Sequence, residues 1–297
     1  MPELPEVETV RLRLEPAVVG RRLERVEIRD SRLTRPEDPV VVAAELLGER
    51  VAALERRGKY LVFRFESGRG LLVHLRMTGG FRLGAGNGLP DDPYVRAVVT
   101  LDDGSDVAYR DVRRFGTWQL LEPHEVEPFL GTRLGEEPLG RRFTARTLGE
   151  RLAGRRAPIK AALLDQRTLA GMGNIYVDEA LWRARIHPLR PARDLDHDDL
   201  KHLHRAVRRA LEVGLARQGS TLRDYRLPDG SGGSMQNEFH VYGRRDEPCD
   251  RCGTLIARTQ VAGRTTWFCP TCQPADAAQA ARSSSRRPSR SRRQSSV

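Results

Sequence analysis

Apolar residues recur along the chain at two different spacings, which predict two kinds of structure. Near the N-terminus they stand three or four residues apart, and this spacing predicts a helix over residues 1–20. The positions are Leu4, Val7, Val10 and Leu14. From residue 23 to residue 121 the pattern changes to short alternating or apolar runs bounded by Gly, Pro and Asp, such as YLVFRF at 60–65. Runs of this kind indicate a β-rich domain, in which a sandwich of two sheets is expected.

The second half of the chain has helical periodicity. Amphipathic segments follow one another between residues 148 and 217, and a glycine-rich turn, GMGN at 171–174, leads into one of them. A proline-bearing stretch at 122–147 is expected to join the two parts. Residues 240–273 contain short apolar pieces that are typical of a β-hairpin finger. The Ser/Arg/Ala-rich end of the chain is expected to stay disordered, because it has too little apolar surface to bury.

The charge of the chain points to a polyanionic partner. The net charge is +11 over 297 residues, and residues 276–297 alone contribute six Arg and one Asp, which leaves +6 for the rest. A basic balance of this kind favours nucleic acid as the partner. No run of 18 apolar residues occurs, so no membrane span is expected. The acidic N-terminus lacks the apolar segment of a secretory signal, and the protein is expected in the cytoplasm.

All four cysteines lie close together near the end of the chain. They form two CxxC pairs, Cys249 with Cys252 and Cys269 with Cys272, separated by sixteen residues. Two such pairs bring four thiolates around one tetrahedral Zn²⁺, so one structural zinc ion is predicted. Two disulfides are the alternative, which a reducing compartment disfavours.

The first nine residues, MPELPEVET, can make a nucleophile of the chain terminus. Removal of Met1 would expose the secondary amine of Pro2, whose pKa is expected near the α-amino value of about 8. A secondary amine that attacks a sugar carbon gives a cationic iminium, which is an electron sink. Glu3 stands beside this amine, and Glu6 follows on the same helical face. A plain helix start, with Pro and acidic residues in the first turn, is the alternative for the same residues.

Seven motifs in this order resemble the Fpg/Nei family of bacterial base-excision-repair DNA glycosylases, on its formamidopyrimidine-DNA glycosylase branch. The motifs cover about residues 1–273. They are MPELPEVET at 1–9, RRGKYL at 56–61, HLRMTGG at 74–80, DVRRFGTW at 111–118, LLDQRTLAGMGNIYVDEALW at 163–182, DGSGGSMQNEFHVYGR at 229–244 and GRTTWFCPTCQ at 263–273.

The resemblance implies an α+β multidomain fold with an N-terminal helix plus β-sandwich, a helix–two-turn–helix domain and a C-terminal zinc-finger β-hairpin. The expected boundaries are 1–135 for the catalytic sandwich, 136–238 for the helix–two-turn–helix domain with a lesion-recognition loop, 239–273 for the finger and 274–297 for the tail. The implied partner is damaged double-stranded DNA in the bacterial nucleoid, on which a monomer would act. The implied activity is removal of oxidised purines, 8-oxoguanine and formamidopyrimidines, followed by β,δ-elimination at the abasic site.

The resemblance also implies catalytic roles. Pro2 matches the Schiff-base nucleophile and Glu3 the residue that protonates the sugar ring oxygen, while Glu6 matches a second, supporting carboxylate. Lys59 matches the lysine of β-elimination, where a cation helps the 3′ phosphate to leave. Arg264 lies between the CxxC pairs and matches the arginine of a phosphate contact and of δ-elimination.

Five further residues match positions that contact DNA in the family. A base that is extruded leaves a gap in the stack, and Met77, Arg113 and Phe115 match the residues that fill this gap. Asn174, at a predicted helix start, offers amide and backbone N–H groups to a phosphate. Arg155 matches a further phosphate contact.

Two positions depart from the family pattern, and two other functions stay open. Asp92, Pro93 and Tyr94 occupy the region where the family often has a DNA-contacting His, and Met235 stands where an aromatic residue is more usual. A Nei-type oxidised-pyrimidine glycosylase is one alternative, which the gap-filling residues and the loop at 229–238 disfavour. A non-catalytic zinc-containing DNA-binding protein is the other, and the terminal Pro2 and Glu3 disfavour it.

Overall fold

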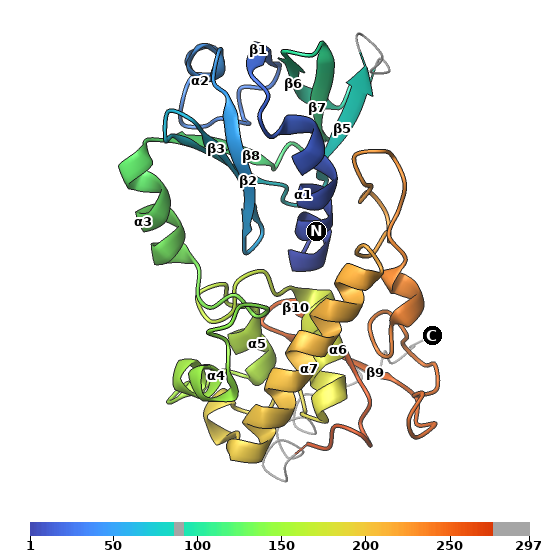
Figure 1. Cartoon of the computed structure of the whole chain (residues 1–297). Coiled ribbons are helices and arrows are strands. Elements are labelled where there is room, and N and C mark those ends of the chain that lie inside the picture. Colours follow the sequence, from blue (N-terminus) through green and yellow to red (C-terminus); the bar gives the residue numbers. More distant parts are fainter. Residues whose placement is uncertain (86–91, 276–297) are drawn as a thin grey trace, which may run out of the picture.

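The structure is a computed structural model that describes residues 1–85 and 92–275. The tail predicted at 274–297 therefore lies almost entirely outside the described residues. A β-sandwich forms one end of the molecule, and helices with a β-hairpin form the other end (Figure 1). Within the described ranges, no helix is long and apolar enough to cross a membrane.

Two antiparallel four-stranded sheets form the sandwich, as the alternating pattern predicts. The first sheet, in spatial order, contains β1 (Leu23–Ile28), β6 (Val95–Leu101), β7 (Ser105–Asp111) and β5 (Gly79–Ala85). The second contains β2 (Val51–Arg57), β3 (Tyr60–Phe65), β4 (Gly70–His74) and β8 (Thr117–Leu121). Apolar side chains from both sheets meet in one core, to which Phe63, Phe81 and Trp118 contribute aromatic rings.

The N-terminal helix α1 (Leu4–Val18) joins this core to the rest of the molecule. Val7, Val10 and Leu14 are fully buried in the sandwich core. Leu4, at the start of the same helix, is fully buried in the core of the helical domain instead. The predicted helix is therefore confirmed, and its apolar stripe serves two domains. The short helix α2 (Pro39–Leu46) packs on β1.

Helix α3 (Pro123–Arg133) crosses from the sandwich to the helical domain. It covers the outer face of the second sheet, where Val126 and Leu130 pack against Val62 and Leu72. The helical domain follows with α4 (Ala145–Leu152), α5 (Ile159–Leu164), α6 (Asn174–Ala184), η1 (Ala192–Asp194), α7 (His197–Ala216) and η2 (Met235–Glu238).

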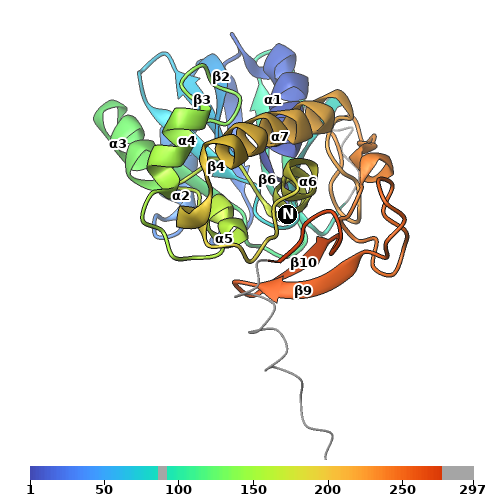
Figure 2. The same cartoon turned by 90° about the horizontal axis from the view of Figure 1, so that it is seen from below.

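The finger is a two-stranded antiparallel hairpin of β9 (Ala257–Val261) and β10 (Arg264–Phe268). Figure 2 shows this hairpin and α7 on opposite sides of α6, and both elements contact α6. The predicted hairpin finger is thus confirmed. Its core is small and includes Trp182 from α6, so the finger is seated on the helical domain.

Candidate active site and nucleic-acid interface

The N-terminus of the chain lies where the sandwich meets the helical domain (Figure 1). Pro2 and Glu3 are both buried there. The Glu3 carboxylate accepts a hydrogen bond of 3.0 Å from the backbone N–H of Ile175 in the first turn of α6. The free N–H groups and the dipole of a helix N-terminus favour a negative charge, so α6 fixes this carboxylate in position. The helical domain thereby orients a side chain that the sandwich domain carries.

Two glycines of the GMGN turn make room for this contact. Gly173 would bring a Cβ within 2.2 Å of the Glu3 carboxyl carbon, so only glycine fits there without moving Glu3. Gly171 has a φ of +85°, and its carbonyl accepts the Leu4 N–H at 3.0 Å. The turn predicted from composition therefore seats the whole N-terminus.

The buried side chain of Glu6 also holds the N-terminal residues in place. Its carboxylate accepts hydrogen bonds from the Glu3 N–H at 2.9 Å, the Tyr176 hydroxyl at 2.9 Å and the Ser220 N–H at 2.8 Å. Complete burial is the main cause that raises the pKa of Glu6, and the Glu3 charge adds to it. Glu6 consequently ties the N-terminus to α6 and to the loop that follows α7, without itself facing solvent.

The terminal amine is in a partly dry environment. Burial lowers the pKa of the Met1 amine from its usual 8.0, whereas the charges of Glu3 and Glu6 oppose this change. Met1 itself is 43% exposed and Pro2 is buried, so removal of Met1 would place the amine one residue deeper. A neutral amine, which nucleophilic attack needs, is favoured by such burial.

Lys59 faces the same group of residues from the β2–β3 turn. It is only 5% exposed, and burial lowers the pKa of its amine. Glu3, Glu6 and Arg264 are near enough for their charges to act on that pKa. The structure therefore brings together all five side chains that sequence comparison implied for catalysis, Pro2, Glu3, Glu6, Lys59 and Arg264.

The β2–β3 turn is held by Glu137, a residue that the sequence did not single out. Its carboxylate accepts the Gly58 N–H at 2.6 Å and lies 2.9 Å from guanidinium nitrogens of both Arg56 and Arg57. Glu137 follows α3 in the chain, so a residue from the helical side clamps the turn that carries Lys59. Folding brings the Glu137 carboxylate close to Arg56, Arg57 and Gly58, which lie about 80 residues earlier in the chain, so no local pattern in the sequence indicates this contact.

His74 is a second residue that sequence reasoning missed, although it opens the quoted motif HLRMTGG. It pairs with Tyr60 across β3 and β4, and its Nδ1 accepts the Arg76 N–H at 3.0 Å. Burial is the main cause that lowers the pKa of His74 to about 3, and the charges of Arg76 and Lys59 lower it further. The imidazole is therefore neutral at physiological pH, beside the lysine.

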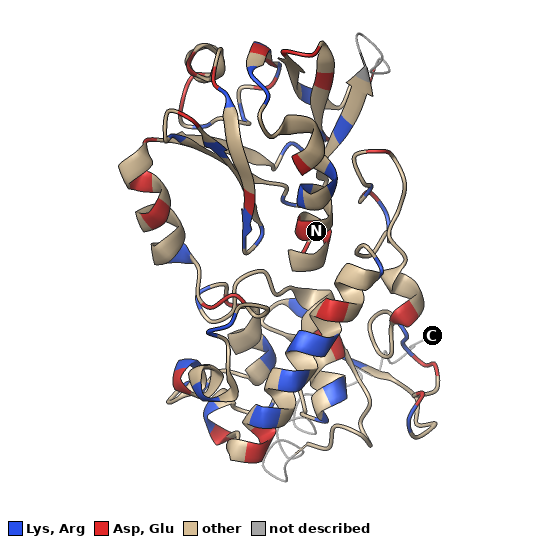
Figure 3. Ribbon diagram, viewed as in Figure 1, with Lys and Arg blue, Asp and Glu red and all other residues tan. Residues whose placement is uncertain are grey.

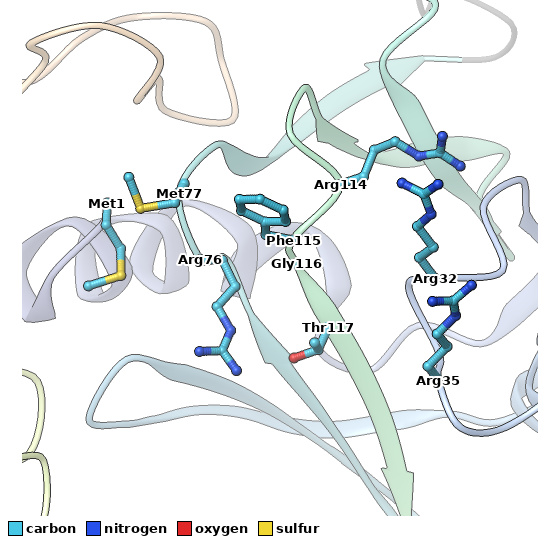
Figure 4. Close-up of a pocket in the computed structure, with 9 residues that line it drawn as sticks. All are labelled: Met1, Arg32, Arg35, Arg76, Met77, Arg114, Phe115, Gly116 and Thr117. Atoms are coloured by element: carbon cyan, nitrogen blue, oxygen red, sulfur yellow. The ribbon is translucent and has the colours of Figure 1, made fainter.

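A basic groove opens next to the N-terminus. It encloses about 700 Å³ and is lined by Met1, Arg32, Arg35, Arg76, Met77, Arg114, Phe115, Gly116 and Thr117 (Figure 4). Phe115 is 52% exposed, so it is not the core residue that its hydrophobicity suggests. Met77 is half-buried, and Arg113 stacks its guanidinium 4.8 Å from the centre of the Phe115 ring. The three predicted gap-filling residues thus project together from two neighbouring loops.

Asp111 supports these two loops. It is 1% exposed, and its carboxylate accepts hydrogen bonds from the Thr78 hydroxyl, the Arg113 N–H and the Gly116 N–H. One buried carboxylate therefore fixes the loop of Met77 against the loop of Phe115. The sequence offered no signal for this role beyond its place in DVRRFGTW.

The predicted phosphate contacts lie at the helical edge of the same region. Asn174 begins α6, and its side-chain amide donates to the Thr265 carbonyl of the finger at 2.9 Å. Arg155 is partly buried and pairs with Asp165 at 3.0 Å. Arg264 is exposed at the start of β10. Figure 3 shows further Lys and Arg at the end of the β2–β3 hairpin and along α7.

The four cysteines converge as their spacing predicts. Their sulfur atoms all lie within 4.8 Å of one another, and none is joined in a disulfide. Zn–S bonds of about 2.3 Å in a tetrahedron place sulfurs roughly 3.8 Å apart, which fits the Cys249–Cys272 separation of 3.9 Å. The Trp182 indole N–H donates to the Cys249 sulfur at 3.4 Å, so α6 also orients a ligand.

The two departures from the family pattern have distinct surroundings. Asp92 pairs with Arg110 at 2.6 Å, directly before β6. Met235 is fully buried in the core of the helical domain. An effect of Met235 on a bound base would therefore be indirect, through the packing beneath the loop.

Three family models match the chain in the order of its domains. "Formamidopyrimidine-DNA glycosylase N-terminal domain" matches residues 1–118, "Formamidopyrimidine-DNA glycosylase H2TH domain" matches 134–226, and "Zinc finger found in FPG and IleRS" matches 246–275. The zinc-finger match agrees with the sulfur cluster, and the finger holds one structural zinc ion.

Similar proteins and structures cover nearly the whole chain. A formamidopyrimidine-DNA glycosylase of Symbiobacterium thermophilum is 49% identical over 92% of this chain and 90% of that protein. One from Bacillus subtilis is 44% identical over 92% and 99%. A crystal structure of a Lactococcus lactis FPG mutant with Fapy-dG containing DNA has a TM-score of 0.86 at 39% identity, and covers 92% of this chain and all of that one. A MutM complex with carbocyclic 8-oxo-G containing DNA has a TM-score of 0.85 at 40% identity, with the same coverage.

Proposed function

The chain belongs to the formamidopyrimidine-DNA glycosylase family, and from this premise we propose that Pro2, Glu3 and Lys59 carry out its chemistry on DNA. It is a DNA glycosylase with AP lyase activity, and its partner is damaged double-stranded DNA. The structures of the relatives contain Fapy-dG, carbocyclic 8-oxo-G or abasic-site DNA, which supports oxidised purines as the substrates of this chain. We place this repair on the DNA of the bacterial nucleoid.

The observation that carries the residue assignment is the position of Glu3. Its carboxylate is held by backbone N–H of α6, and it stands next to the buried Pro2 and within electrostatic reach of Lys59. If Glu3 served only to begin helix α1, it would not need a hydrogen bond from the backbone of a second domain. An amine, a fixed carboxylate and a lysine of lowered pKa are the groups that opening a sugar and eliminating its phosphates require.

The proposed reaction begins at the sugar of the damaged nucleotide. The neutral Pro2 nitrogen forms a bond to C1′, and the base leaves with the electron pair of its bond to C1′ and takes a proton from water. The Glu3 carboxylate accepts the proton that the Pro2 nitrogen loses and gives it to the ring oxygen as the bond from C1′ to that oxygen breaks. The product is an iminium between Pro2 and the sugar. Loss of a C2′ proton then expels the 3′ phosphate in β-elimination, with Lys59 beside the leaving group. A second elimination expels the 5′ phosphate, which Arg264 would neutralise.

DNA binding is proposed to use the groove beside the N-terminus. The exposed ring of Phe115, the thioether of Met77 and the guanidinium of Arg113 would enter the gap that the extruded base leaves. Asn174 and Arg155 would contact phosphates, exchanging their present partners Thr265 and Asp165 for the DNA backbone.

Contacts near residues 135 and 238 support the domain boundaries that the resemblance implies. α3 ends at Arg133. Directly after it, the Gly135 carbonyl accepts a hydrogen bond from Arg57, and the Glu137 carboxylate accepts one from the Gly58 N–H. η2 ends at Glu238, and the backbone N–H groups of residues 240–242 all bind Glu179 of α6. We therefore propose boundaries near residues 135 and 238.

The experiment that tests the proposal is covalent trapping. The purified protein is incubated with duplex DNA that carries one 8-oxoguanine opposite cytosine, and borohydride is added to reduce any iminium. The expected result is an adduct whose N-terminal peptide starts at Pro2 and carries the sugar. Glu3→Gln is expected to bind the duplex but not to excise the base. An adduct on a lysine, or an adduct that forms only with an oxidised pyrimidine, would contradict the proposal.

A further inference from the structure

A buried ion pair lies beneath the finger, outside the groups assigned to the reaction. Lys160 of α5 and Asp178 of α6 are 0% and 1% exposed, and Lys160 Nζ lies 2.7 Å from an Asp178 carboxylate oxygen. Burial is the main cause that raises the pKa of Asp178 to about 7, and it lowers the pKa of Lys160. Removing two charges from water is costly, so such a pair is a poor source of stability. A role in fixing geometry is the better account of its presence.

The ion pair is bonded to three consecutive residues of β10. Lys160 Nζ donates to the Thr265 carbonyl at 3.0 Å and to the Thr266 hydroxyl at 2.8 Å. The other oxygen of Asp178 accepts the Trp267 N–H at 3.2 Å. These contacts attach β10 to α5 and α6 over Thr265, Thr266 and Trp267, the three residues that follow Arg264.

The contacts continue as far as Arg264. The Thr266 hydroxyl, which accepts from Lys160, itself donates to the Arg264 carbonyl at 3.1 Å. A continuous line of polar contacts thus leads from Asp178 through Lys160 and Thr266 to the backbone of Arg264. Arg264 is exposed, and the described part of the chain gives it no ion pair of its own. The direction of its side chain therefore depends on how its backbone is held.

Zinc by itself is too far away to hold this position. Cys269 is five residues beyond Arg264, and an extended strand rises about 3.3 Å per residue, which gives roughly 17 Å. A lone two-stranded hairpin is marginally stable, so its far end needs another attachment. The zinc site lies beyond one end of β10, and the ion pair holds the strand over the three residues next to Arg264.

We propose that Lys160, Asp178 and Thr266 form a relay of positioning residues that holds Arg264 in place for δ-elimination. The inference rests on the proposed function, in which Arg264 assists departure of the second phosphate. The relay would then determine what share of the abasic-site product proceeds from the β-elimination aldehyde to the 3′ phosphate. The Asn174 amide also donates to the Thr265 carbonyl. If Asn174 turns to a DNA phosphate, Lys160 still donates to that carbonyl and keeps the strand in place.

The test is a substitution that removes one link of the relay and leaves the ion pair intact. Thr266→Val keeps the shape of a fully buried side chain in a strand and deletes its hydroxyl. Thr168→Val is the matched control, because Thr168 is also fully buried but its hydroxyl has no hydrogen-bond partner in the described structure. The measured quantity is the ratio of 3′-phosphate to unsaturated-aldehyde ends formed from a preformed abasic site in a single turnover.

Thr266→Val is expected to lower this ratio on the order of tenfold, less than the roughly hundredfold cost of a full ångström of misplacement, because only one of the contacts that hold β10 is removed. Zinc content, imine trapping and base excision should equal those of the wild-type protein, as should every property of Thr168→Val. The double variant Lys160→Met with Asp178→Asn, which leaves no unpaired buried charge, should lower the ratio at least as far.

Two results would overturn the relay. One is an unchanged product ratio in both Thr266→Val and the double variant. The other is a fall in zinc content and imine trapping in parallel with the ratio, since the relay would then only maintain the fold. A wild-type protein that formed no imine at Pro2 would instead refute the proposed function, so the two failures are distinguishable.

Discussion

Gly173→Ala tests whether the exact position of the Glu3 carboxylate matters for base excision. Gly173 has an extended backbone, with φ of −141° and ψ of −166°, which alanine adopts without strain. The new Cβ would lie 2.2 Å from the Glu3 carboxyl carbon, although ordinary contacts begin near 3.4 Å. The shortfall is about 1.2 Å, so the carboxylate has to move away from α6.

The expected loss follows from that displacement. The Glu3 carboxylate would give up its hydrogen bond from the Ile175 N–H, which is 3.0 Å long in the native chain. An ångström of misplacement in a catalytic group costs on the order of a hundredfold in rate. This loss corresponds to about 2.7 kcal/mol, since each tenfold change is about 1.36 kcal/mol. We therefore expect the rate of excision to fall about a hundredfold, with DNA affinity and zinc content unchanged.

The assay is single-turnover excision of 8-oxoguanine from a duplex, with the cleaved strand measured on a gel after alkali. Gly131→Ala is the matched control, because its Cβ meets nothing within 4 Å in α3. A glycine replaced by alanine within a helix typically gains roughly 0.5–1 kcal/mol of stability, so this variant should excise normally. Wild-type excision by Gly173→Ala would refute the reasoning, provided that Glu3→Gln is inactive.

Three further predictions concern the other parts of the site. Glu137→Ala should reduce strand cleavage by about tenfold and base excision by less, because the turn that carries Lys59 loses the hydrogen bond between the Gly58 N–H and the Glu137 carboxylate. Equal losses in both steps would count against this prediction. Removal of zinc by a chelator should abolish δ-elimination through Arg264 while circular dichroism still reports an intact sandwich, and zinc-free protein with normal products would contradict the structural role. The rate of imine trapping at Pro2 should rise with pH and level off below pH 8, because burial lowers the pKa of the Met1 amine and the same burial is expected to act on the Pro2 amine that removal of Met1 exposes, whose neutral form predominates above its pKa. A rate that keeps rising well beyond pH 8 would show that the amine is not desolvated.

Local pattern in the sequence predicted the elements and the zinc site of this protein, and the family resemblance implied the roles of the catalytic residues. Helical spacing predicts α1, and alternation predicts the sandwich strands, because burial on one side of a regular element imposes a period on the residues. The CxxC pairs predict a zinc site, since two adjacent ligands in each pair already fix half of a tetrahedron. Pro2 is a candidate nucleophile from the sequence, because removal of Met1 would expose a secondary amine there.

Tertiary structure decided which charged residues are held in place and by what. In the sequence, Lys59 and Lys160 resemble any surface lysine, and only packing reveals that they are 5% and 0% exposed. The partners of Glu3 lie more than 170 residues away on α6, and the turn of Lys59 is clamped by Glu137 from the other domain. Hydrogen bonds of this kind leave no period in the sequence, because they depend on where whole elements meet. The composition of the site is therefore local information, whereas its geometry exists only once the two domains and the finger have come together.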